Sequence, residues 1–138
     1  MIHPSISSLV VGSSLVALIF RLGVFSKKHR DFSSKASSVS FLICTILVIA
    51  SFLTGFFSGV EGEIIKEHYF LARITLFLVL VSSLVVGLKF LGVSSFRYEI
   101  LALILTFSSF VLIVLSGQKG NELAKTRLEQ KLTGLSSQ

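Results

Sequence analysis

This chain has few charged residues, no tryptophan, one proline and one cysteine. Charged residues make up 14% of the 138 residues, whereas a soluble domain usually carries about a quarter. This deficit argues against a soluble globular domain. The single proline, Pro4, stands near the start of the chain, so it leaves later helices uninterrupted. The single cysteine, Cys44, excludes a disulfide or a cysteine-based metal motif within the chain.

Apolar residues are abundant and come in long blocks. They account for 52% of the chain, whose mean hydropathy is +0.87. A helix that crosses a hydrocarbon core of about 30 Å needs roughly 20 residues, and four blocks have about that length. We therefore predict an all-α integral membrane protein folded as an antiparallel four-helix bundle. The predicted spans are residues 5–25, 38–57, 69–90 and 100–116.

The sequence divides into two regions. Residues 1–118 form the predicted four-span transmembrane domain, and residues 119–138 form a polar C-terminal tail. Leu123, Leu128 and Leu132 fall close to one stripe in the tail, with charged residues between them. This pattern predicts a short extramembrane helix that ends at Gly134. Such a helix would lie on the membrane surface, dock on a partner, or extend into solvent.

Basic residues gather on one side of the predicted bundle. Its first and third loops are rich in lysine and arginine, whereas the second loop is acidic. The positive-inside rule therefore places the first and third loops in the cytoplasm. We expect a multi-pass protein of the bacterial inner membrane with periplasmic N and C termini, and no nucleic-acid partner. The basic residues are Lys27, Lys28, Arg30, Lys35, Lys89, Arg97 and Arg21, the last by snorkelling; the acidic ones are Glu61, Glu63 and Glu67.

Small residues spaced four apart recur in every predicted span, as is typical of helices that pack closely in lipid. In the second span they are Ser51, Gly55 and Gly59. Gly55 is expected at a helix crossing near the outer end of its span. A glycine there would also allow a flat cofactor to approach the backbone. The other pairs are Ser8 with Gly12, Ser83 with Gly87, and Ser116 with Gly120.

Two histidines precede apolar spans on the same side of the membrane. His3 comes just before the first span and His68 just before the third. An even number of crossings separates these positions, so both imidazoles fall at similar depth. Paired imidazoles in apolar surroundings can ligate a b-type haem or a metal ion. They can also serve simply as polar anchors at the interface.

Arg73 lies about one turn inside the third predicted span, where an ionisable residue is a functional candidate. It would pair with Glu63 or Glu67 across the outer interface, or it would meet the propionates of a haem held by His68. His29 lies in the basic first loop and is expected to be solvated.

The chain resembles the bacterial four-helix membrane proteins grouped as domain of unknown function 2231. The resemblance is carried by His3-Pro4, Thr54-Gly55, His68 and the run Ser116-Gly117-Gln118-Lys119-Gly120. It extends to about Leu123. It departs at Ser58, where the family pattern has an acidic residue, and at Ala72, where asparagine is common. The resemblance implies a haem or metal role in an electron-transfer system.

Two functions remain open from the sequence. In the first, the protein is a small membrane subunit with an outward-side haem b or metal site, acting in electron transfer within a larger redox complex. His3 and His68 would be the axial ligands, with Arg73 and Gly55 beside the cofactor. In the second, it is a cofactor-free structural or assembly subunit of a membrane complex. The sequence shows no catalytic triad, carboxylate pair or phosphate loop, so a non-catalytic subunit is favoured over an independent enzyme.

Overall fold

Over the residues that it describes, the computed structural model has four long α-helices and one short 3-10 helix. It describes residues 2–56, 63–93 and 95–135, and it describes side chains for residues 6–55, 66–93, 95–122, 124–126 and 129. The elements are α1 (Ile2–Gly23), α2 (Arg30–Phe56), α3 (Glu63–Gly87), η1 (Leu88–Leu91) and α4 (Phe96–Leu135).

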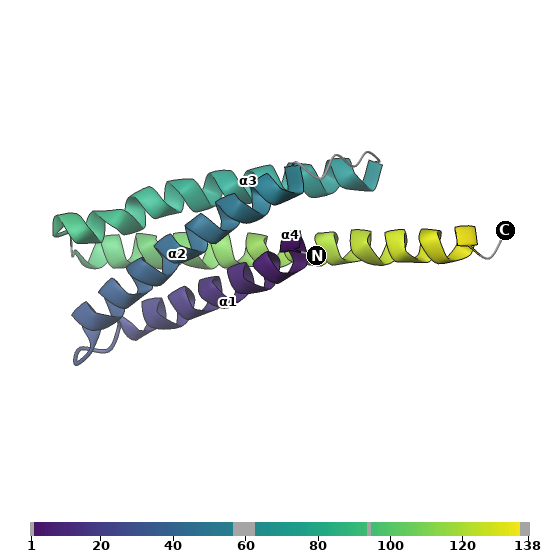
Figure 1. Cartoon of the computed structure of the whole chain (residues 1–138). Helices are drawn as coiled ribbons and strands as arrows, with labels where there is room; N and C mark the ends of the chain where they lie inside the picture. Colours follow the sequence, from purple (N-terminus) through teal and green to yellow (C-terminus); the bar gives the residue numbers. More distant parts are fainter. Residues whose placement is uncertain (1, 57–62, 94, 136–138) are drawn as a thin grey trace.

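The four helices run alternately in opposite directions, as Figure 1 shows. Each helix packs against the next one along the chain, and α4 closes the ring by packing against α1. Short connections between antiparallel neighbours produce this arrangement. The connection between η1 and α4 turns at Gly92, whose φ of 86° lies in the left-handed region that glycine tolerates. The predicted antiparallel arrangement is thus seen in the described part of the chain.

All four helices are long and apolar enough to cross a membrane. The membrane-compatible segments are Ile6–Gly23, Arg30–Gly55, Lys66–Leu91 and Phe96–Thr126, and each overlaps one of the predicted spans. Residues 119–135 of the predicted C-terminal tail are helical, but they do not form a helix separate from the fourth span. Instead, α4 continues for 40 residues without a break, because no proline or turn interrupts residues 96–135. Its last part projects beyond the other three helices (Figure 1).

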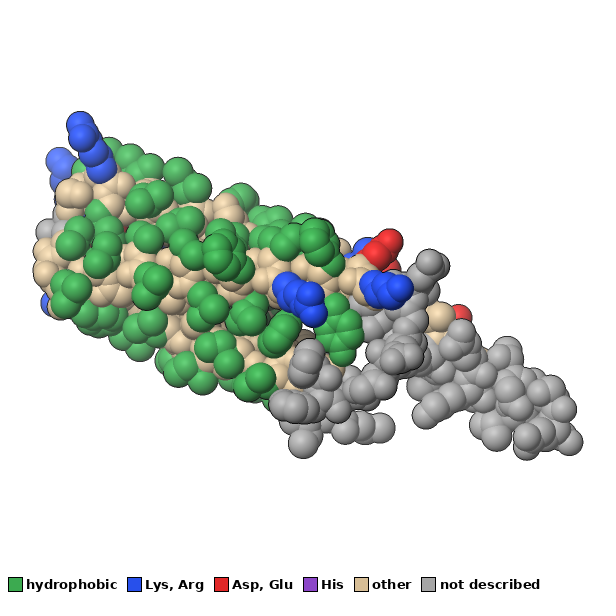
Figure 2. All heavy atoms as spheres, turned by 90° about the horizontal axis from the view of Figure 1, so that it is seen from above, with side chains coloured by type: hydrophobic (Ala, Val, Ile, Leu, Met, Phe, Trp, Pro, Cys, Tyr) green, Lys and Arg blue, Asp and Glu red, His purple; other side chains and the backbone are tan. Residues whose placement is uncertain are grey.

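Large apolar side chains cover the outside of the bundle. Phe70, Phe77, Leu84 and Ile46 are each at least 66% exposed. Figure 2 shows hydrophobic side chains over most of one face, with charged side chains toward its ends. Such a surface would be unfavourable in water and suits a lipid bilayer. The protein is therefore a multi-pass membrane protein.

The interior combines an apolar core with many buried serine and threonine residues. Ser14, Ser37, Ser82 and Ser109 are almost completely buried. Ser37 donates a hydrogen bond from α2 to the carbonyl of Ala17 in α1, and the hydroxyls of Ser82 and Ser109 lie 3.1 Å apart between α3 and α4. Small residues allow close helix approach, and their hydroxyls link the helices.

Glycine contributes less to this packing than the spacing pattern predicts. A side chain added at Gly12 or Gly87 would meet no atom within 4 Å, so these glycines do not sit at close helix contacts. Gly59 lies outside the described residues.

Candidate functional site

The two ends of the bundle differ in their buried polar groups. At the end where α1 finishes and α4 begins, Arg21 and Glu99 are buried and form an ion pair of 2.9 Å. Arg21 also donates to the hydroxyl of Ser38 at 3.3 Å, and Ser34 donates to the second carboxylate oxygen of Glu99 at 3.0 Å. These contacts join α1, α2 and α4. Among the described residues, Arg21 Nε has no hydrogen-bond partner.

Lys89 of η1 extends this group of charges. Its ammonium lies 3.6 Å from Glu99 and 3.5 Å from Asp31, and its side chain is 7% exposed. Asp31 is largely exposed and also pairs with Lys35. We refer to Arg21, Glu99, Lys89, Ser34 and Ser38 as the ion-pair cluster. Its residues come from α1, α2, η1 and α4.

The ion-pair cluster corrects the prediction that was made for Arg21. Arg21 does not snorkel to the surface, because its guanidinium is held inside by Glu99. Lys89 and Glu99 are buried as well. The other five basic residues counted on this side are exposed: Lys27, Lys28, Arg30, Lys35 and Arg97.

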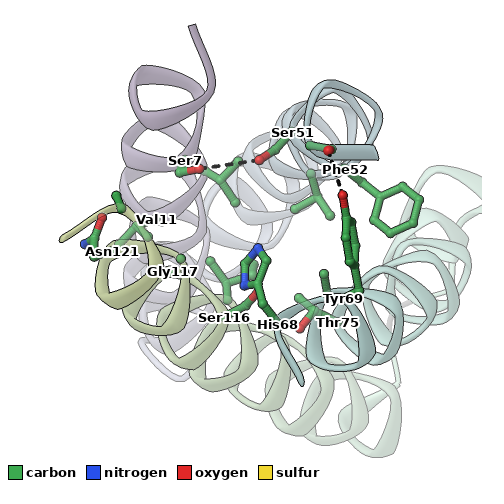
Figure 3. Close-up of a pocket in the computed structure, with 17 residues that line it drawn as sticks. Ser7, Val11, Ser51, Phe52, His68, Tyr69, Thr75, Ser116, Gly117 and Asn121 are labelled. Atoms are coloured by element: carbon green, nitrogen blue, oxygen red, sulfur yellow. Dashed lines mark hydrogen bonds between the residues drawn. The ribbon is translucent and has the colours of Figure 1, made fainter. Parts of the chain in front are cut away.

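The opposite end of the bundle contains a cavity of about 160 Å³. It lies where α1 begins, α2 ends and α3 begins, and α4 passes along its remaining side. Figure 3 shows side chains from all four helices around this hollow, which we call the mouth cavity. Its lining residues are Ser7, Val10 and Val11 of α1; Val48, Ser51, Phe52 and Gly55 of α2; His68, Tyr69, Ala72 and Thr75 of α3; and Ile113, Ser116, Gly117, Gly120, Asn121 and Ala124 of α4.

The mouth cavity combines apolar walls with several uncharged polar groups. Tyr69 donates to the carbonyl of Gly55 at 2.9 Å, which joins α3 to the end of α2. The hydroxyls of Ser7 and Ser51 approach to only 3.5 Å across α1 and α2. Ser116 and Asn121 of α4 make no hydrogen bond to a described residue. The cavity therefore retains donors and acceptors for a ligand.

His68 is a central residue of the mouth cavity. Its ring projects into the hollow in Figure 3, and its Cε1 would lie 3.3 Å from a side-chain carbon added at Gly120. The absence of a side chain at Gly120 thus makes room for the imidazole. His3 belongs to α1, but its side chain lies outside the described residues, so its relation to His68 stays a prediction.

The remaining candidate residues are placed differently. Gly55 lines the mouth cavity. Arg73 is exposed, does not line it and forms no ion pair with a described residue. His29 is exposed in the turn between α1 and α2, as expected. Tyr69, Ser116 and Asn121 are lining residues that the sequence did not mark as polar cavity groups, although Ser116 lies in the glycine-containing run of α4.

The volume of the mouth cavity bears on the predicted haem. Sites that enclose drug-sized ligands usually measure about 300–1,000 Å³. A cavity of about 160 Å³ is smaller than this range, and the haem site stays a prediction because the side chain of His3 lies outside the described residues. Across the described residues, no group of three or more His, Cys, Asp or Glu side chains could hold a metal ion. His68 is the one described histidine among the lining residues of this site.

Comparisons with known proteins do not identify a family for this chain. No protein-family model, curated protein or solved structure matches it. The resemblance to domain of unknown function 2231 therefore has no support from a family model.

Proposed function

We propose that the protein is a non-catalytic membrane protein that binds a small, uncharged molecule in the mouth cavity. The observation that carries this proposal is the cavity itself, because all four helices line it and leave polar groups facing its interior. Ligand sites commonly lie between the helices of bundles, with apolar walls and a few polar groups that orient the ligand. Engineered apolar cavities of about 150 Å³ bind benzene, which sets the expected ligand size.

The ligand-binding end is proposed to face the periplasm. Five exposed basic residues surround the ion-pair cluster at the other end: Lys27, Lys28, Arg30, Lys35 and Arg97. Exposed cations beside the ends of membrane helices favour the cytoplasm. On this orientation, both termini of an inner-membrane protein lie outside, and the mouth cavity opens toward the outer half of the bilayer.

Fluorine NMR with para-fluorophenol tests the proposed site. The protein is placed in lipid nanodiscs, and the probe is titrated. Saturable binding is expected, because a defined cavity fills whereas partition into lipid does not. Gly117→Leu should abolish the saturable signal: Gly117 lines the cavity, and a side-chain carbon there meets no atom within 4 Å.

The matched control is Gly12→Leu. Gly12 is also helical and surrounded by open space, but it does not line the mouth cavity. Equal binding by both variants would contradict the proposal. An absorption spectrum of protein from haem-replete cells provides a second check. A Soret band that is lost in His68→Ala would favour the haem site predicted from the sequence.

A second candidate is a structural or assembly subunit that docks on other subunits of a membrane complex. The observation that favours it is the C-terminal part of α4, which extends beyond the bundle (Figure 1). Truncation after Thr126 keeps every residue of the mouth cavity. Loss of partner subunits from the purified truncated protein, with ligand binding intact, would support this role.

A further inference from the structure

We propose that the end of the bundle around the ion-pair cluster carries a binding surface for an anionic phospholipid of the bilayer. Four exposed cations form this surface, which we call the basic surface: Lys27, Lys28, Arg30 and Arg97. It lies at the opposite end from the mouth cavity, so the proposal is independent of the ligand proposed for that cavity.

The first step is the excess of positive charge at this end. The carboxylates of Asp31 and Glu99 lie here, and both are already paired: Asp31 with Lys35 at 2.8 Å and Glu99 with Arg21 at 2.9 Å. Among the described residues, no carboxylate forms an ion pair with a cation of the basic surface. Like charges gathered at one end repel one another, so an anion supplied from outside the chain stabilises them.

The second step is the arrangement of these cations, which come from two separate connections of the chain. The rings of Phe25 and Phe96 meet edge to face with centroids 6.4 Å apart, which places the start of α4 beside the turn after α1. Lys89 Nζ lies 3.5 Å from Asp31, which joins η1 to the start of α2. Arg97 is therefore held at the same end as the cations of residues 27–30. Figure 2 shows Lys and Arg side chains at this end, on the left of the hydrophobic face.

The third step is the apolar surface beside the cations. Leu22, Phe25, Phe32 and Phe96 are each at least 47% exposed. The four cations lie at or near the limits of the membrane-compatible segments of α1, α2 and α4, which is the level of the lipid headgroups. Clusters of Lys and Arg next to membrane helices attract anionic headgroups. A phospholipid offers a phosphate to the cations and acyl chains to the exposed apolar side chains, whereas a soluble acidic polypeptide satisfies only the charges.

Tryptophan fluorescence provides a local readout, because the chain has no tryptophan. Phe25→Trp places a reporter beside the basic surface. Leu53→Trp is the matched reporter: Leu53 is also 47% exposed, and it lies near the other end of α2, where the sequence has no Lys or Arg between Lys35 and Lys66. Each protein is reconstituted into phosphatidylcholine vesicles that contain a small fraction of lipid with brominated acyl chains. The brominated lipid is either phosphatidylglycerol or phosphatidylcholine, and bromine quenches tryptophan on contact.

Brominated phosphatidylglycerol should quench the Phe25→Trp reporter as strongly as an about fivefold larger fraction of brominated phosphatidylcholine. This is the preference that the attraction of one cation for an anionic surface provides. The Leu53→Trp reporter should be quenched equally by the two lipids. Sodium chloride at about 1 M should reduce the preference at Phe25→Trp without any change to the cations, since it shortens the screening length to about 3 Å.

Charge removal tests which cations are responsible. Replacing Lys27, Lys28 and Arg30 together with glutamine should abolish the preference at the Phe25→Trp reporter, and Arg97→Gln alone should reduce it. The charge-matched control replaces three exposed cations of the opposite end with glutamine and should leave the preference unchanged. These control residues are Lys66, Arg73 and Lys119.

Three results would overturn the proposal. The first is equal quenching of the Phe25→Trp reporter by the two lipids, and the second is an equal preference at the Leu53→Trp reporter. The third is loss of the preference when soluble poly-glutamate is added to the vesicles, which would assign the basic surface to an acidic polypeptide instead.

Discussion

The two ends of this bundle differ in how their polar groups are paired. In the ion-pair cluster, Arg21 and Lys89 each contact Glu99, and Ser34 donates a hydrogen bond to the same carboxylate. In the mouth cavity, Ser116 lines the hollow and makes no hydrogen bond to a described residue. A polar group in a low-dielectric interior must find a partner. The polar groups of the ion-pair cluster have polar partners within the protein, whereas the mouth cavity retains polar groups that a ligand can hydrogen-bond.

The largest expected effect is all-or-none and concerns which side of the membrane each end faces. A reporter that is active only in the periplasm, fused after Lys28, should be silent, whereas the same reporter fused after Gly62 should be active. The expected result follows from the exposed basic residues around the ion-pair cluster. The reverse pattern would place the mouth cavity in the cytoplasm and contradict the proposed orientation.

The next largest effect is expected on stability, and it tests whether the ion-pair cluster stabilises its end of the bundle. Arg21→Ala should lower the free energy of unfolding by about 3–5 kcal/mol, because it leaves Glu99 buried with an incomplete set of partners. Titration with a denaturing detergent, followed by circular dichroism, measures this change. The exposed Arg97, changed to alanine, is the control and should have little effect.

A double variant, Arg21→Met with Glu99→Leu, sharpens this test. Replacing both members of a buried pair with apolar residues is often neutral, so much of the lost stability should return. If the double variant is as unstable as Arg21→Ala, then packing rather than charge pairing explains the role of these side chains.

The smallest effect compares the two tyrosines, each of which donates to a backbone carbonyl. Tyr98 donates to Val86 at 3.0 Å and is 6% exposed, whereas Tyr69 donates to Gly55 beside the mouth cavity. Tyr98→Phe should lower the free energy of unfolding by about 1–3 kcal/mol, since a buried acceptor loses a partner. Tyr69→Phe should cost only about 0.5–1.5 kcal/mol. If both substitutions lower the free energy of unfolding equally in the same detergent titration, then the hydrogen bond of Tyr69 is as well shielded from solvent as that of Tyr98.

The sequence predicted the helical class, the number of spans and their order, because long apolar blocks leave few alternatives in a membrane. It did not predict that α4 would continue through the tail, since a helical pattern with polar side chains is compatible with either a separate helix or an extension. Arg21 and Glu99 were visible as opposite charges at the same end of an antiparallel bundle. Their pairing could have been proposed from that order, whereas the participation of Ser34 and Lys89 could not.

At the mouth cavity, sequence reasoning selected His68 and Gly55, and both line it. It also selected Arg73, which is exposed outside the cavity. The side chain of His3 lies outside the described residues, so its role as a second ligand is untested. Sequence position gives the depth of a residue in the membrane, but depth alone does not say which side of its helix faces the interior.

The sequence by itself determined that this protein lies in lipid and that it has four helices. It also determined the end of the bundle at which the exposed basic residues gather. These features depend on composition and on the order of residues along the chain. Only the tertiary structure decided which polar residues meet. Ser34 contacts Glu99 across 65 positions, and His68 lies against Gly120. Such contacts depend on the rotation of each helix about its axis. That rotation is set by the packing of all four helices together, a property that no single segment contains.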